Sequence, residues 1–188
     1  MKKTKAFNRT TLQSIASAFG AGQTSAAQTI AEAIEALMQA VECARVSLWR
    51  FERIGHARGL RCFGAKRAGE PLAEDGMLLV EDEYREYYAA LVERSTFVSN
   101  DAMRDTRLIA MRGSYLQKHD ISALLDVAVT INGRAYGIVC CEQMGTPHAW
   151  SPRQVRVARE AVTYAGMLFA RESSIRLDLH ESLPIEPF

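Results

Sequence analysis

The stretch at residues 114–143, SYLQKHDISALLDVAVTINGRAYGIVCCEQ, decides the fold of this chain. Its segment Ile121–Ile131 is rich in β-branched and aliphatic residues, and residues 135–142 are apolar again. Asn132 and Gly133 between them tolerate the positive φ angles of a type I′ turn, so the stretch predicts a long β-hairpin. Because both arms carry apolar residues on both faces, we expect this hairpin at the centre of a sheet that is covered on its two sides.

The segments around the hairpin alternate between strand and helix patterns. Apolar residues at helical spacing behind Thr24 or Ser25 predict a helix to about residue 43, and Ser151-Pro152 starts a last helix expected to reach about residue 179. Strands are predicted at 45–51, 60–65, 77–80 and 96–99, and shorter helices at 81–94 and 105–119. Together these elements predict an α/β (α+β) fold, with a central antiparallel sheet of five to six strands, helices on both faces, and the N- and C-terminal helices packed together.

The length and composition suit one compact domain. The chain has 188 residues, of which 48% are apolar, enough for a single sizeable core. We expect an N-terminal arm at 1–23, either a short helix or a loose segment, one domain at 24–180 that includes the terminal helices, and a C-terminal tail at 181–188.

The charge of the chain is nearly balanced. Twenty-three Lys and Arg residues stand against twenty-two Asp and Glu residues, which removes the electrostatic argument for a nucleic-acid or membrane surface. The sequence has no apolar run of the length that a membrane span needs and no apolar segment behind its basic start. We therefore expect a cytoplasmic protein without a nucleic-acid or membrane partner.

The order of the segments resembles a known family. The run YLQKHDISALLDVAVTINGRAYGIVCCE, followed by HAWSPRQ, is similar to the second half of a GAF domain. With ARVSLWRFE and FVSNDAMRDTRL from the first half, the resemblance covers about residues 44–171. GAF domains are small-molecule-sensing and dimerising modules of bacterial signalling proteins, and phytochromes are built on one. The resemblance thus implies a GAF-like fold and a sensory role, but it names no ligand.

Known catalytic and metal-binding patterns are absent from the sequence. It contains no GxSxG, no phosphate-binding glycine loop and no HExxH. Cys43, Cys62, Cys140 and Cys141 follow neither a metal-ligand spacing nor a disulfide framework, and we expect them to be buried thiols. We therefore expect neither a metal site nor an enzyme.

The resemblance suggests two further activities, bilin attachment and sulfoxide reduction, and this sequence lacks the residue pattern that each of them needs. Phytochrome-type GAF domains attach a bilin through a cysteine and place a histidine three residues before a tyrosine that Tyr115 matches; here that position is Arg112, and no cysteine lies between Cys62 and Cys140. No covalent bilin is expected. GAF-type methionine sulfoxide reductases use cysteines on loops above the pocket, whereas Cys140 and Cys141 lie within a predicted strand.

Binding remains as the expected function, in a pocket between the sheet and the helices at 81–94 and 105–119. Small-molecule sites combine aromatic and aliphatic walls with a few polar anchors. The candidate lining residues of this kind are Trp49, Phe63, Tyr87, Arg112, Tyr115, Ser122, Asp126 and Cys141. Asp126 interrupts an apolar strand, so we expect it to pair with Arg107 or Arg112, either as a ligand anchor or as a structural salt bridge.

Three hypotheses follow. The first is a non-catalytic GAF sensory or regulatory module that binds a small molecule, forms a homodimer through its terminal helices and signals through a separate output protein. The second is a ligand-free scaffold whose cavity is filled by its own side chains, such as Phe63, Tyr87, Met111 and Tyr115. The third is an enzyme of the sulfoxide-reductase type, which the cysteine positions disfavour.

Overall fold

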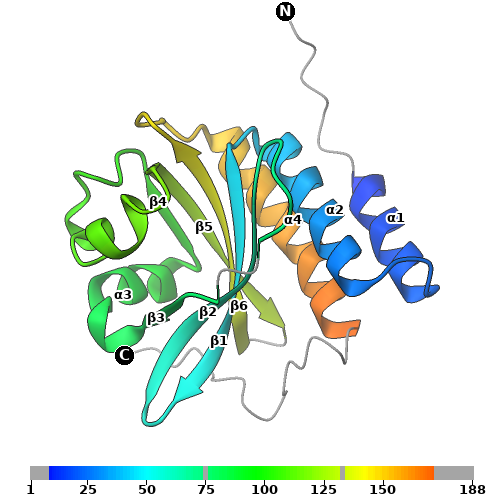
Figure 1. Cartoon of the computed structure of the whole chain (residues 1–188), viewed down its shortest axis with the longest axis horizontal. Coiled ribbons are helices and arrows are strands. Elements are labelled where there is room, and N and C mark those ends of the chain that lie inside the picture. The colour runs from blue at the N-terminus through cyan, green and yellow to red at the C-terminus, as the bar shows by residue number, and fades with distance from the viewer. Residues whose placement is uncertain (1–8, 74–75, 132–133, 172–188) are drawn as a thin grey trace, which may run out of the picture.

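The computed structural model describes residues 9–73, 76–131 and 134–171, and these form one six-stranded antiparallel sheet between two layers of helices (Figure 1). The order of the strands across the sheet is β3-β2-β1-β6-β5-β4. Their bounds are β1 Arg45–Ile54, β2 Ala57–Arg67, β3 Leu78–Val80, β4 Thr96–Ser99, β5 Ile121–Ile131 and β6 Arg134–Met144. The predicted fold class is confirmed.

The predicted hairpin is the centre of the sheet. Strand β5 pairs with β6 from Ile121 opposite Met144 to Ile131 opposite Arg134, and β6 then pairs with β1. The Asn132-Gly133 turn itself lies outside the described residues. Strands β5 and β6 have a neighbour on each edge, and their side chains are buried in a core on each face of the sheet, as the apolar pattern predicted.

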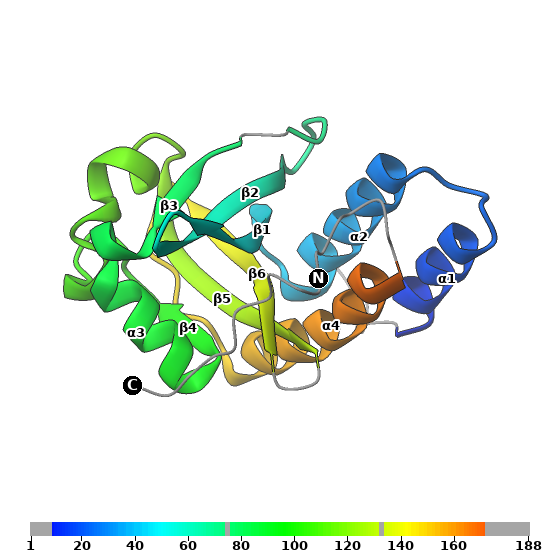
Figure 2. The ribbon, with the colours of Figure 1, turned by 90° about the horizontal axis from the view of Figure 1, so that it is seen from below.

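Helices α2 Ala26–Val41 and α4 Pro152–Arg171 cover one face of the sheet, and α1 Arg9–Gly20 lies on their outer side (Figures 1 and 2). Helix α2 begins as predicted, with the Ser25 side chain accepting a hydrogen bond from the Gln28 amide at 3.2 Å. Ser151 caps α4 in the same way through the Gln154 amide at 3.3 Å. Part of the predicted arm is helix α1, which packs on α2 and α4, so the terminal helices do lie together.

Helix α3 and several short turns cover the other face. The predicted helix at 81–94 is divided into a 3-10 turn at Glu81–Glu83 and helix α3 at Arg85–Arg94. The predicted helix at 105–119 is wrong: this segment forms a 3-10 turn at Thr106–Leu108 and a π-helical turn at Arg112–Leu116. The β-branched Thr106 and Ile109 and the glycine at 113 are weak helix formers, and burial of Leu108, Met111, Tyr115 and Leu116 holds the segment in place without a regular helix.

The sheet separates two apolar cores. Along β5, Ala123, Leu125 and Val127 face the α2–α4 layer, whereas Leu124 and Ala128 face the α3 layer. This alternation follows from the period of two in a strand. Within the described part of the chain, no helix has the length and apolarity to span a membrane.

Candidate functional site

A buried polar network lies on the α3 face of strands β1 and β6. The Arg45 guanidinium of β1 forms an ion pair with Glu142 of β6, and its Nη1 also donates to the Tyr115 hydroxyl at 2.9 Å. Tyr115 donates in turn to Glu142. Ser47 donates to Glu142 at 3.2 Å and accepts a hydrogen bond from the Trp49 indole at 2.9 Å. Arg45, Ser47 and Trp49 meet here because alternate residues of β1 face the same side.

Charge and burial fix the protonation of this network. Burial lowers the pKa of Arg45, but the adjacent Glu142 carboxylate raises it well above its usual range, so the guanidinium stays charged. Burial and the negative charge of Glu142 raise the pKa of Tyr115, so its hydroxyl stays a donor. The network is therefore one charged pair with a neutral phenol bridging both partners.

Asp126 and Tyr87 form a second buried polar pair on the same face. The Tyr87 hydroxyl donates to Asp126 Oδ2 at 2.8 Å, while Oδ1 makes no hydrogen bond with a described nitrogen or oxygen. Burial raises the pKa of Asp126 to about 7, although the hydrogen bonds from Tyr87 and Cys140 oppose this shift. The predicted partner was wrong, since Arg107 pairs instead with Asp105 at 2.5 Å. The Nε of Arg112 has no hydrogen-bond partner among the described residues.

The structure brings together four of the eight predicted site residues: Trp49, Tyr87, Tyr115 and Asp126. The Trp49 and Tyr115 rings meet edge to face with centroids 5.4 Å apart. Arg112 and Ser122 lie at the margin of this group; Arg112 is half-buried in the π-helical turn, and Ser122 is buried at a register irregularity of β5.

The remaining two predicted site residues lie on the wrong face. Phe63 and Cys141 pack in the core below α2 and α4, so the sheet separates them from Trp49 and Tyr115. Contact with the Cys43 thiol and burial raise the pKa of Cys141. The sequence alone could not predict the face on which these two residues lie. That face depends on the register of the strands, and the register of β1 on β2 shifts between Leu48 and Trp49.

The space that was expected to hold a ligand is filled by side chains. Trp49, Tyr87, Tyr88, Tyr115 and Phe97 are among the largest fully buried side chains of the described chain. Tyr87 stacks edge to face on Phe97, with ring centroids 5.1 Å apart. These rings satisfy their polar groups with partners inside the protein, as the Tyr88 hydroxyl does with the Leu79 carbonyl at 2.6 Å.

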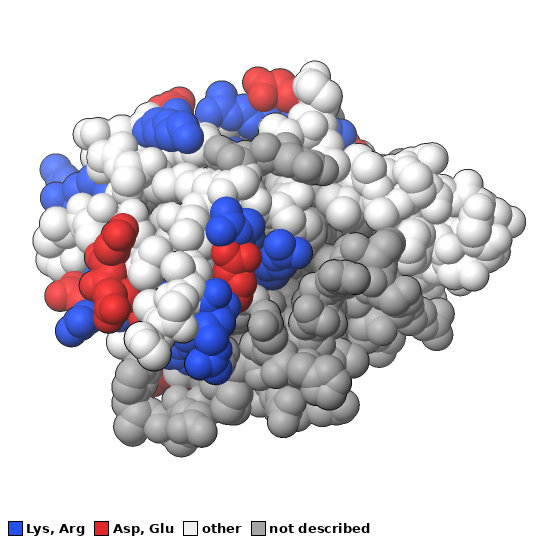
Figure 3. Space-filling view, turned by 60° about the horizontal axis from the view of Figure 1, so that its bottom comes forward, with Lys and Arg blue, Asp and Glu red and all other residues white. Residues whose placement is uncertain are grey.

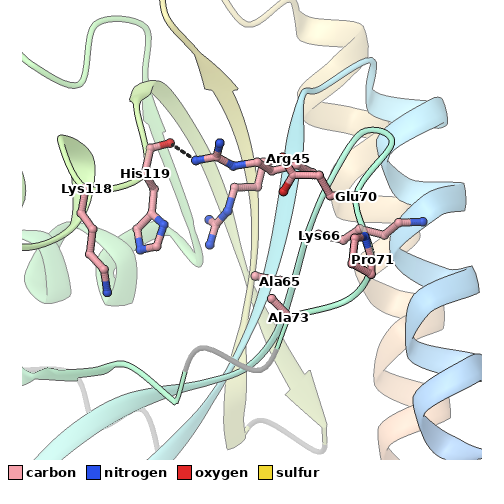
Figure 4. Close-up of a pocket in the computed structure, with 9 residues that line it drawn as sticks. Arg45, Ala65, Lys66, Glu70, Pro71, Ala73, Lys118 and His119 are labelled. Atoms are coloured by element: carbon pink, nitrogen blue, oxygen red, sulfur yellow. Dashed lines mark hydrogen bonds between the residues drawn. The ribbon is translucent and has the colours of Figure 1, made fainter.

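A cavity of about 320 Å³ opens beside this filled space, at the margin of the sheet (Figure 4). One wall is the end of β2 with the chain that returns after it, and the other is the segment before β5. Figure 4 shows Lys118 and His119 on one side, Lys66 and Pro71 on the other, and Arg45 between them. The residues that line the cavity are Arg45, Ala65, Lys66, Arg67, Glu70, Pro71, Ala73, Lys118 and His119.

Local hydrogen bonds hold both walls of the cavity. Gly69 has a φ angle of 80°, a left-handed conformation suited to glycine, and it lets the chain fold back on β2. Ala65 and Ala73 then exchange two backbone hydrogen bonds of 2.8 Å. Across the cavity, Arg67 Nη2 donates to the His119 carbonyl at 3.0 Å. The cavity is thus framed by paired backbone on one side and tied to the opposite side by one guanidinium.

Sequence reasoning missed the residues of the network and the cavity. Arg45 and Glu142 are charged residues within strand segments that are otherwise largely apolar, which is a signal of a buried pair. Their pairing needs the register of β1 on β6, which brings together residues far apart in the sequence. For Arg67 and Lys118 the sequence offered no specific signal.

On the molecular surface, charges of both signs alternate. Figure 3 shows Lys and Arg side chains next to Asp and Glu side chains on one face. Arg58 and Glu81, for example, form a two-fold hydrogen-bonded pair at 2.6 and 2.5 Å. No group of three His, Cys, Asp or Glu residues with metal-binding geometry occurs among the residues that the structure describes.

Comparisons with known proteins agree with this architecture. The GAF domain of a phosphoenolpyruvate-protein phosphotransferase from Acinetobacter superposes with a TM-score of 0.65 at 13% identity, over 88% of this chain and 94% of its own. The blue-light-absorbing form of the PixJ GAF domain from Thermosynechococcus elongatus gives 0.59 at 16% identity, over 95% and 100%. A biliverdin-bound protein in its far-red-absorbing dark state superposes with a TM-score of 0.62 at 14% identity, over 85% of this chain and 97% of its own. At these identities the likeness shows the fold alone.

No curated protein matches the sequence. The sequence model of the GAF domain matches residues 25–168, which is most of the chain and includes α2, the whole sheet and most of α4. The six-stranded sheet with helices on both faces is also the fold of the solved GAF domains. This protein belongs to the GAF domain family.

Proposed function

We propose that this GAF domain is a regulatory module without catalytic activity, and that it binds a small molecule in the cavity between the end of β2 and the segment before β5. The cavity is the observation that supports the proposal. Its volume of about 320 Å³ falls at the lower end of small-molecule sites, which typically span about 300–1,000 Å³. The ligand would therefore be small.

The state of the cysteines supports a role without catalysis. All four cysteines are buried. Burial raises the pKa of the Cys140 thiol, and contact with Cys43 together with burial raises that of Cys141. Since the thiolate is the nucleophile, both groups are poor candidates for sulfoxide reduction. The module would then act by binding, and a separate output protein would read the bound state.

A ligand in this cavity would touch two parts of the chain that are far apart in the sequence. The return after β2 and the segment at Lys118 and His119 form opposite walls, joined by the Arg67 hydrogen bond to the His119 carbonyl. A molecule that contacts both walls would favour the conformation in which they are close. This gives binding a structural consequence that a partner protein could recognise.

A thermal-shift screen of the full chain with small acids, phosphates, amines, sugars and nucleosides tests this proposal. Ala73→Phe places a ring at the cavity wall, and Ala68→Phe adds the same ring to the exposed turn nearby. A ligand at 100 times its Kd should raise the Tm of the wild type and of Ala68→Phe by about 5 °C or more, and leave Ala73→Phe unchanged. A shift that persists in Ala73→Phe would place binding elsewhere and contradict the proposal.

The filled interior favours a second candidate function, a ligand-free scaffold. Trp49, Tyr87 and Tyr115 occupy the space between the sheet and α3 and are at most 2% exposed. Such a domain would act through its surface alone. A screen in which no compound raises the Tm of the wild type would support the scaffold and exclude the sensor.

We further propose that the chain forms a homodimer through its terminal helices. Residues 10–31, which include all of α1 except its first residue, Arg9, and the first part of α2, contain no charged side chain. The corresponding end of the molecule is uncharged on the face seen in Figure 3. Depletion of charge is typical of the centre of protein interfaces.

A further inference from the structure

We propose that the cavity selects a small organic anion and holds its carboxylate or phosphate group with Arg67 and Lys118. This inference rests on the proposed function, because it names the class of ligand for the same cavity. The charges that line the cavity are the starting point. Arg45, Lys66, Arg67 and Lys118 are cations, His119 is a further nitrogen donor, and Glu70 carries the opposing charge.

Two of these cations, Arg45 and Lys66, form ion pairs with carboxylates of the protein. Arg45 pairs with the buried Glu142. Lys66 pairs with Glu35 of α2 at 2.6 Å. Their charges are largely neutralised within the fold, so an incoming anion would have to displace a carboxylate to use them in full.

Arg67 has a different environment. Its Nη2 donates to a neutral acceptor, the His119 carbonyl at 3.0 Å, and it forms no ion pair with a described carboxylate. A guanidinium has five N–H donors in a planar fork, and apart from Nη2 the Arg67 donors have no hydrogen-bond partner among the described residues. This geometry suits a carboxylate or phosphate, which accepts two parallel hydrogen bonds.

Lys118 and Glu70 are the other two charged residues that line the cavity. Lys118 is exposed on the wall opposite β2, next to His119, and adds a positive charge to that side of the cavity. Glu70 is exposed at the rim, so water and salt screen its charge, whereas Arg67 is half-buried. Of these three charges, that of Arg67 is the least screened, so we expect its attraction to outweigh the repulsion from Glu70 for an anion inside the cavity.

Arg45 connects the cavity to the buried network and to a spectroscopic reporter. It lines the cavity and donates to Tyr115, whose ring lies 5.1 Å from the His119 ring. Tyr115 also packs on Trp49. An anion near Arg45 should therefore change the emission of Trp49. The second tryptophan, Trp150, packs on His148 in the other core, so Trp150→Phe leaves Trp49 as the single reporter.

The test uses two pairs of probes that differ in charge: glycerol phosphate against glycerol, and succinate against succinamide. The full chain is titrated at constant ionic strength, and both Tm and the Trp49 emission of Trp150→Phe are recorded. We expect saturable changes with the anions and none with the neutral partners. If the screen described above finds ligands of this cavity that are all neutral, the anion inference is wrong while the proposed function stands.

Variants locate the binding group. We expect Arg67→Gln to weaken anion binding at least tenfold, Arg67→Lys to recover part of it, and Lys118→Gln to weaken it severalfold. Glu70→Gln should strengthen it. Arg53→Gln removes the same charge from an exposed residue near the far end of β1 and should leave binding unchanged. Equal losses in Arg67→Gln and Arg53→Gln would show non-specific attraction and overturn the inference.

Discussion

Arg45 and Glu142, which are 97 residues apart in the chain, form an ion pair with side chains only 3% and 0% exposed. The Tyr115 hydroxyl bridges both partners, and Ser47 gives Glu142 a further hydrogen bond. Removing two charges from water is costly, and a buried pair is retained only where such bonds satisfy both ions. The pair joins β1 to β6, the first and last strands in chain order, which are neighbours in the sheet, and its Arg45 lines the cavity.

Breaking this pair should strongly destabilise the fold. Glu142→Gln leaves the Arg45 charge buried without its partner, so we expect a loss of about 3–5 kcal/mol in the free energy of unfolding, measured by urea denaturation. The double variant Arg45→Met/Glu142→Leu removes both charges and should recover most of that loss. As a control, Arg85→Gln breaks the exposed pair with Asp82 and should cost less than about 1 kcal/mol. A similar small cost for Glu142→Gln would contradict the buried pair.

Asp126 should make stability depend on pH. Because burial raises its pKa to about 7 in the folded protein, the folded state holds a proton that the unfolded chain releases from about pH 4 upward. Relative to Asp126→Asn, the wild type should therefore be most stable below pH 4 and lose up to about 4 kcal/mol as the pH rises to 7. Denaturation curves across this range measure the difference. The exposed Asp82→Asn should show no such trend, and a flat difference for Asp126→Asn would exclude the buried acid.

Gly137 of β6 lies opposite Arg50 of β1, at a place that leaves no room for a side chain. A Cβ at this position would lie 1.9 Å from the Trp49 carbonyl oxygen, and the obstacle is backbone that cannot move aside. We expect Gly137→Ala to cost about 3 kcal/mol through overpacking, with a matching fall in Tm. Gly20→Ala at the end of α1 meets nothing within 4 Å and should be neutral or slightly stabilising. Equal Tm values for the two variants would show that the strands are farther apart.

The dimer proposal can be tested on α4. In the sequence, Tyr164, Leu168 and Ile175 extend an apolar stripe, although their side chains lie outside the described part of the structure. We expect light scattering to give a dimer for the wild type and a folded monomer for Leu168→Glu, because a charge is costly to bury at a helical seam. Thr163→Glu adds the same charge to an exposed position of α4 and should remain dimeric. A monomeric wild type would contradict the proposal.

The fold could be predicted because its signals are local. The β-branched run at Ile121–Ile131, the caps at Ser25 and Ser151 and the strand at Thr96–Ser99 each depend on neighbours in the sequence, and all appear in the structure. The helix predicted at 105–119 failed for a related reason. Its apolar spacing reflects burial of Leu108 and Tyr115, which short 3-10 and π turns achieve as well as an α-helix.

The site could be predicted only in part because it depends on register and on pairing across the sheet. Trp49, Tyr87, Tyr115 and Asp126 lie on one face of the sheet, where they are packed in the interior, and Asp126 takes Tyr87 as its partner and not an arginine. A tyrosine satisfies the carboxyl group without bringing a second charge into the core. Arg45 and Glu142 were missed because strands β1 and β6 meet only in the folded sheet.

Nuclear magnetic resonance tests the central claim, that the cavity beside β2 is a ligand site, most directly. The ¹⁵N-labelled full chain is titrated with glycerol phosphate and with glycerol at constant ionic strength. We predict saturable amide shifts that are largest at Ala65, Arg67 and His119, with glycerol phosphate alone. Shifts spread over the exposed arginines near the β1–β2 turn, or shifts at no residue, would contradict the claim.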